Sequence, residues 1–206
     1  MVLKRIFFRF VGTIFLPRRT FRVITKERVN SLEGPVVSSV VFMGFVVVVY
    51  FVKGSISIYT ALYLFCLLHG IWFVFTYFMH RIFMYAYGIS RNFAEFYGVV
   101  SYSLPSSTII YLSALAIKFL KISTLVVIVS TTILLLSVWL LWLLCLIYIA
   151  THIYYDVQPT QFLTTLLMVL MTLLFVGAYI YIAFNEFFKP LIEMVKIESA
   201  KFSRLP

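Results

Sequence analysis

The sequence predicts an all-α integral membrane protein: a bundle of five transmembrane helices preceded by an amphipathic helix at the membrane interface. Of its 206 residues, 63% are hydrophobic and 12% are charged, with a mean hydropathy of +1.06. Soluble domains are about 45–50% apolar and about 25% charged. A soluble domain of this length leaves roughly a third of its unfolded surface exposed to water, so it could not hide this much apolar surface. We therefore expect lipid around most of the chain.

Residues 1–34 are predicted to be a basic, amphipathic, cytoplasmic segment. Apolar residues recur there at three- and four-residue spacing and share one helical face: Leu3, Ile6, Phe7, Phe10, Val11 and Ile14. Pro17 ends this helix, and a second short helix is expected from Arg18 to Leu32 with Phe21 and Ile24 inward. Such a helix lies in the membrane interface, with a partner subunit as the alternative contact for its apolar face. The side chains assigned to lipid head groups are Lys4, Arg5, Arg9, Arg18, Arg19 and Arg22.

Residues 35–184 are predicted to form the five-span membrane domain, and residues 185–206 a short charged tail with an interfacial helix near 190–200. The expected spans are 35–52, 58–79, 96–117, 125–149 and 160–184. Each has at least 18 apolar-dominated residues, enough to cross about 30 Å of hydrocarbon. A polar centre surrounds Pro105 in the third span, which predicts a kink there, with a re-entrant segment as the alternative.

The distribution of basic residues predicts the orientation of the chain. With five spans, ten Lys and Arg residues lie on the same side of the membrane as the N-terminus, and seven lie on the opposite side. Because basic residues gather on the cytoplasmic side, the N-terminus is expected to be cytoplasmic. Basic charge beside apolar spans is better explained by anionic lipid than by nucleic acid, so no nucleic-acid partner is expected.

The spans carry few residues suited to catalysis. His69 is the one titratable side chain near the centre of a span, and we interpret it as a neutral histidine hydrogen-bonded across helices. His152 and Asp156 share a helical face and are expected to cap the end of the fourth span. No recognised catalytic, nucleotide or metal motif is present, so the sequence predicts no enzyme, no metal and no cofactor.

Short motifs at the spans resemble the Ypt-interacting-protein (Yip) domain family. They are Leu32-Glu33-Gly34-Pro35 before the first span, and Gly88 to Phe93 followed by Tyr102, Leu104 and Pro105 in the third. Pro17 to Phe21 also looks like the lead of the prokaryotic members. The resemblance implies five spans and structural roles for Gly34, Pro35, Gly88, Phe93, Tyr102, Leu104 and Pro105.

The resemblance also implies a function. Eukaryotic relatives bind Rab-type GTPases, but here the N-terminal part is only 34 residues with Glu27 and Glu33 as its only acids, so GTPase binding is not supported. The chain looks more like prokaryotic members, which implies a non-enzymatic scaffold or accessory subunit in the cell membrane. Membrane lipids, other integral membrane proteins or a second copy are the expected partners.

Two other functions stay open on the sequence. A transporter or channel subunit would use a polar path near Pro105, with His69 and Ser103 along it, because broken helices with polar centres form midplane substrate sites. A membrane enzyme would use His152 and Asp156.

Overall fold

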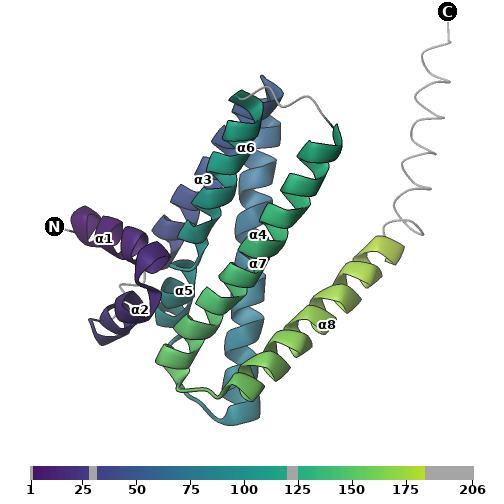
Figure 1. Ribbon diagram of the computed structural model, residues 1–206. Helices are drawn as coiled ribbons and strands as arrows, with labels where there is room; N and C mark the ends of the chain where they lie inside the picture. Colours follow the sequence, from purple (N-terminus) through teal and green to yellow (C-terminus); the bar gives the residue numbers. More distant parts are fainter. Residues whose placement is uncertain (1, 28–31, 120–124, 184–206) are drawn as a thin grey trace, which may run out of the picture. The chain divides into compact units, whose positions relative to one another are not determined.

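The computed structural model describes residues 2–27, 32–119 and 125–183, and the described part is all-helical. The helices are α1 (Val2–Phe15), α2 (Pro17–Lys26), α3 (Glu33–Lys53), α4 (Ile58–Tyr87), α5 (Phe93–Ser101), the short 3-10 helix η1 (Leu104–Ser107), α6 (Thr108–Phe119), α7 (Leu125–Tyr155) and α8 (Pro159–Ala183) (Figure 1). Five helical segments in these residues are long and apolar enough to cross a membrane: Glu33–Lys53, Ile58–Tyr87, Phe93–Phe119, Thr131–Tyr155 and Pro159–Tyr179. By length and composition of the helices, the prediction of five candidate spans is confirmed.

The chain divides into two compact units, residues 1–163 and 164–206. In the first unit, α3 packs against α4, α5 and α6, while α2 packs against α1 and α7 (Figure 1). α1 also contacts η1. We call the part of this unit formed by α1, α2, the start of α3, α5, η1 and the end of α7 the basic end. Helix α8 begins in the first unit, with Pro159 in its first turn, and continues as an apolar helix into the second.

The α-helix of the third span is interrupted around Pro105, where the sequence analysis predicted a kink. The α-helical pattern stops at Ser101, η1 contains the proline, and α6 resumes at Thr108. Side-chain hydroxyls bond to backbone carbonyls around the break: Ser103 donates to Val100 at 2.7 Å, and Thr108 donates to Pro105. These bonds satisfy carbonyl groups near the point where proline removes a backbone donor.

The third span runs along the whole of α3, which argues against a re-entrant segment. Gly34 at the start of α3 lies against Gly98 of α5. At the other end, the Lys118 ammonium of α6 donates to the carbonyls of Phe51 and Val52. A re-entrant loop would return to the first end instead of reaching the second.

The second span is longer than the sequence analysis predicted. Its expected end at His80 and Arg81 is wrong, because α4 continues to Tyr87 and then ends at Gly88, whose φ is +66°. His80 is 4% exposed and hydrogen-bonded to Tyr155, so the histidine is inside the fold and not at an exit from it. At 30 residues, α4 is about 45 Å long, more than the hydrocarbon core requires.

Other boundaries shift for similar reasons. Helix α7 continues past the predicted end at residue 149 because Tyr154 and Tyr155 are buried in its last turn. The predicted polar loop 88–95 is shorter, since Asn92 caps α5 by accepting the Ala94 N–H at 2.8 Å. Helix α2 ends at Lys26, before the predicted residue 32, and its Phe21 and Ile24 are buried as expected. The predicted helix in the tail lies outside the described residues.

Candidate functional site

A buried ion-pair network joins the N-terminal helices to the start of α3. Glu33 is the first residue of α3, and its side chain is only 2% exposed. Its carboxylate accepts hydrogen bonds from Arg5 at 2.6 Å, from Arg9, and from the hydroxyl of Tyr102 at 2.9 Å. Because a buried charge is tolerated only when it is paired and hydrogen-bonded, Glu33 depends on α1 and on the turn before η1.

Arg9 is the second buried member of this network. It was expected at lipid head groups, but its side chain is 4% exposed and pairs with Glu33 and, at 2.6 Å, with Glu27. That expectation is wrong because helical spacing within α1 cannot reveal an acid 24 residues away. Burial lowers the pKa of Arg9, but the hydrogen bond to Glu27 and the charge of Glu33 outweigh it, so the pKa lies above its ordinary value. Arg5 is partly exposed while it pairs with Glu33.

Gly34 lets α3 and α5 approach closely beside this network. A Cβ atom at Gly34 would lie 2.6 Å from the Tyr97 ring and 2.9 Å from the Gly98 Cα. The Tyr97 and Ser38 hydroxyls are hydrogen-bonded at 3.2 Å across the same contact. Glycine is therefore required here by space, since the neighbouring backbone leaves no room for a side chain.

The residues assigned to the family motif fall into two places. Gly34 and Pro35 lie at the start of α3, and Tyr102, Leu104 and Pro105 are buried in and beside η1. Gly88 and Phe93 lie instead at the loop between α4 and α5: Gly88 ends α4, and the Phe93 ring packs on Phe73 and Tyr77 of α4. The motif residues thus mark the α3–α5 contact and the α4–α5 corner.

His69 is hydrogen-bonded across helices, as the sequence analysis expected. Its Nδ1 donates to the Phe65 carbonyl at 3.3 Å, and Nε2 lies 3.2 Å from the hydroxyls of Ser38 and Ser39 on α3. It also borders a groove of about 490 Å³ together with Tyr97. Ser103 is fully buried and donates to Val100, and no hydrogen bond within the described ranges joins it to His69.

A further cluster was not predicted from the sequence. The Tyr155 hydroxyl bonds to His80, whose ring stacks on Phe96 with centroids 5.8 Å apart. The Tyr154 hydroxyl donates to the Glu95 carboxylate at 3.2 Å. These groups come from three helices, and the two hydrogen-bonded pairs are 75 and 59 residues apart in the chain, so no local spacing could reveal them.

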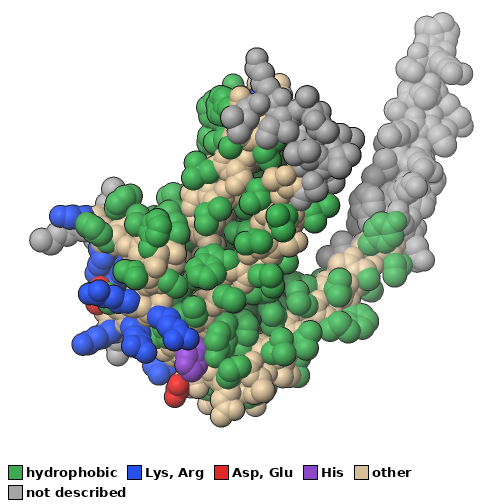
Figure 2. All heavy atoms as spheres, in the orientation of Figure 1, with side chains coloured by type: hydrophobic (Ala, Val, Ile, Leu, Met, Phe, Trp, Pro, Cys, Tyr) green, Lys and Arg blue, Asp and Glu red, His purple; other side chains and the backbone are tan. Residues whose placement is uncertain are grey.

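Lysine and arginine side chains gather over α1 and α2 in Figure 2, with a histidine and an acid beside them. Lys4, Arg18, Arg19 and Arg22 are all exposed. Arg18 and Arg22 border a cavity of about 430 Å³, whose other lining residues are Tyr148, Ile149, His152, Ile153 and Asp156.

His152 and Asp156 lie at the end of α7, as predicted. His152 Nδ1 donates to the Val157 carbonyl at 2.7 Å, and Asp156, whose φ is +58°, donates its N–H to the His152 carbonyl. Both contacts satisfy backbone groups where the helix stops. Among the residues that the structure describes, no group of three His, Cys, Asp or Glu side chains is placed to hold a metal ion.

Comparison with protein-family models, with curated proteins and with solved structures finds no match to this chain. The resemblance to the Yip family therefore stays a prediction that rests on the motif residues themselves.

Proposed function

We propose that this chain is a non-enzymatic, Yip-like membrane scaffold or accessory subunit of a larger membrane complex, with a cytoplasmic N-terminus in a prokaryotic cell membrane. The observation that supports this proposal most directly is how its buried polar side chains are used. Glu33 and Arg9 pair with each other, His80 pairs with Tyr155, and the Trp72 indole donates to Ser101 at 3.1 Å. Each of these bonds joins one helix to another.

Buried polar groups that already bond to one another favour a structural role over catalysis or transport. A catalytic or transport site needs side chains that exchange partners with a substrate or with water. Here the buried groups just named already hold partners in neighbouring helices, and losing one partner would leave a charge or donor unpaired. The network therefore suits a platform that keeps α1 and α2 fixed on the spans.

The spans also present apolar surface outward. One face of α4 carries exposed side chains at helical spacing: Tyr59 (81% exposed), Tyr63 (65%), Leu67 (41%) and Ile71 (55%). Such a face has two uses in a membrane, contact with lipid tails and contact with another membrane protein. A scaffold requires contact with another membrane protein.

Site-specific photocross-linking in the native membrane tests the proposal. A photoreactive residue at Tyr63 or Ile71 is expected to give discrete adducts with a defined membrane protein or with a second copy. The same residue at Met79, which is fully buried, is the matched control and should give only intramolecular adducts. Lipid adducts alone at every exposed position of the described spans would contradict the scaffold proposal.

A transporter or channel subunit is the second candidate, favoured by the groove that His69 and Tyr97 border. Purified chain in liposomes should show no ion or solute flux above empty vesicles if it is a scaffold. A flux that disappears in His69→Ala or Ser103→Ala would establish the transport function instead, provided that both variants remain folded.

A further inference from the structure

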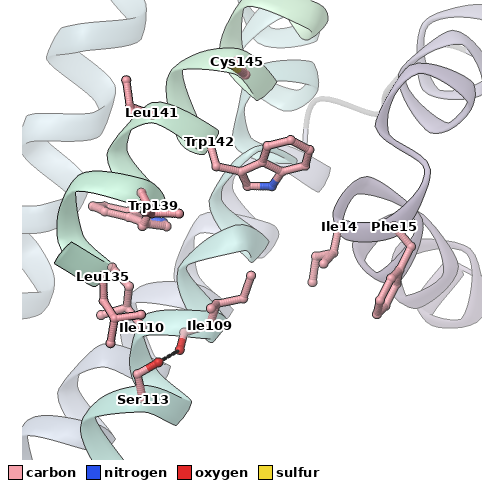
Figure 3. Close-up of a pocket in the computed structure, with 11 residues that line it drawn as sticks. Ile14, Phe15, Ile109, Ile110, Ser113, Leu135, Trp139, Leu141, Trp142 and Cys145 are labelled. Atoms are coloured by element: carbon pink, nitrogen blue, oxygen red, sulfur yellow. Dashed lines mark hydrogen bonds between the residues drawn. The ribbon is translucent and has the colours of Figure 1, made fainter. Parts of the chain in front are cut away.

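Two cavities open along one face of α7. The first, of about 520 Å³, is apolar and is bordered by Ile14 and Phe15 of α1, Ile109 of α6, and Leu135, Trp142 and Cys145 of α7 (Figure 3). The second is the polar cavity between α2 and the end of α7. Lining residues of the two follow each other along α7 at alternating three- and four-residue steps: Leu135, Val138, Trp142, Cys145, Ile149 and His152. This spacing places them on one face of the helix.

The opposite wall is continuous as well. Ile14 and Phe15 at the end of α1 border the apolar cavity, and Arg18 at the start of α2 borders the polar one. Only Leu16 and Pro17 separate these residues in the chain. Figure 3 shows Trp142 projecting from α7 toward the end of α1. The two cavities are therefore bordered by successive residues of the same two walls, and we call them together the α7 groove.

The α7 groove changes character along its length. Its apolar part lies beside the middle of a membrane-length helix and is lined by Trp142, Ile109 and their neighbours. Its polar part carries two guanidinium groups, of Arg18 and Arg22, against one acid, Asp156. Positive charge at one end and apolar surface at the other match a molecule with an anionic head and a hydrocarbon tail.

We propose that the α7 groove is a specific site for an anionic phospholipid. The guanidinium groups of Arg18 and Arg22 bind the phosphate, because they present paired N–H donors to its oxygens. One acyl chain lies along Trp142 in the apolar part. A free phosphate would leave the apolar part unfilled, and a zwitterionic head would bring another positive charge to a site where the two arginines already outnumber the acid.

Tryptophan quenching by lipids with brominated acyl chains tests the site. The full chain carries Trp72 and Trp139 changed to Phe, so that Trp142 is the only indole. Mixed micelles at low lipid mole fraction contain brominated phosphatidylglycerol or phosphatidylcholine with the same chains. Quenching of Trp142 should reach half its maximum at a roughly tenfold lower mole fraction of phosphatidylglycerol than of phosphatidylcholine. The reason is that each basic side chain near an anionic head group increases the affinity by a factor of about a few. A chain that keeps only Trp72 should show no such preference.

A matched pair of double variants separates the groove from general attraction. Arg18→Gln with Arg22→Gln should abolish the preference for phosphatidylglycerol. Arg19→Gln with Lys26→Gln removes the same charge from exposed positions of the same helix, outside the groove lining, and should keep the preference. Equal loss in both pairs would overturn the proposal, since it would mean that the charge of α2 acts without a site.

Asp156→Asn gives an effect of opposite sign. Asn adopts a positive φ as readily as Asp, so the end of α7 is preserved. Removing the negative charge should strengthen phosphatidylglycerol binding several-fold, which no unfolding artefact can imitate. Unchanged or weaker phosphatidylglycerol binding would show that the bound head does not face Asp156, and would overturn the proposal. Full competition by inorganic phosphate would also overturn it, because the site would then recognise an anion and not a lipid.

Discussion

The two halves of the third span are built differently, although they belong to one continuous segment. In α5 and η1, most side chains are buried, and Tyr97 and Ser101 hydrogen-bond to α3 and α4. In α6, no side chain is fully buried, although this helix also packs against α3 and α7. The fold is therefore tied together at the basic end by polar and close contacts, and beyond Pro105 by looser apolar contacts.

This difference shows where a membrane protein of this kind obtains a defined structure. Apolar packing between spans gains little over contact with lipid, because lipid tails are as apolar as the side chains. Paired charges, hydrogen bonds and a glycine contact have a defined geometry, and they gather where α1, α3 and α5 meet. Paired substitutions in the two regions, measured by SDS-induced unfolding in mixed micelles, test this contrast.

The largest effect is expected for Glu33→Gln. The change keeps the size of the side chain but leaves Arg9, 4% exposed, with only the half-exposed Glu27 as a charged partner. Breaking a buried pair costs about 3–5 kcal/mol, and we expect the free energy of unfolding to fall by about that amount. The variant should also be cleaved by protease within α1 faster than the unchanged chain. An unchanged unfolding midpoint would show that the network does not hold the basic end together.

A smaller loss is expected for Gly34→Ala. The added methyl would lie 2.9 Å from the Gly98 backbone, so α3 and α5 must separate, at a cost of about 1–3 kcal/mol or somewhat more. Gly44→Ala is the control in the same helix, because its Cβ would make an ordinary 3.6 Å contact with the Tyr111 ring. Similar unfolding midpoints for the two variants would count against a close α3–α5 contact.

Ser101→Ala should destabilise less again. Ser101 is fully buried, and its loss removes the hydrogen bond that the Trp72 indole N–H donates, whose net contribution is about 0.5–1.5 kcal/mol. Ser113→Ala in α6 is the comparison, since that hydroxyl bonds only to the Ile109 carbonyl of its own helix. Trp72 fluorescence should change in the first variant alone. If both serines prove equally dispensable, the two halves of the span do not differ in the way described.

The smallest effect is expected for Lys118→Gln at the far end of the unit. Its ammonium is exposed and bonds to carbonyls at the end of α3. Exposed charged contacts contribute little, so the unfolding midpoint should stay within the error of measurement. A loss comparable to that of Glu33→Gln would place an anchor at both ends of the unit.

The sequence predicted features that depend on neighbouring residues. Apolar runs of sufficient length predicted the candidate spans, Pro105 with its hydroxyls predicted an irregularity where the α-helix is interrupted, and helical spacing predicted the burial of Phe21 and Ile24. It could not predict partners that only the tertiary fold brings together. Arg9 has the same spacing as a surface arginine, but the fold pairs it with Glu33. His80 beside Arg81 looks like the exit of a span, but the fold places it against Tyr155.

The position of Glu33 has a consequence for biosynthesis. A ribosome that makes this chain produces Arg5 and Arg9 before the acid, and Tyr102 only after two further membrane segments. An unpaired acid at the entry of the first hydrophobic segment would oppose its transfer into the bilayer. The chain supplies the counter-charges first, so the first segment can be integrated as a neutralised unit. The Tyr102 hydroxyl can complete the hydrogen bonding of Glu33 only after the third segment has been made.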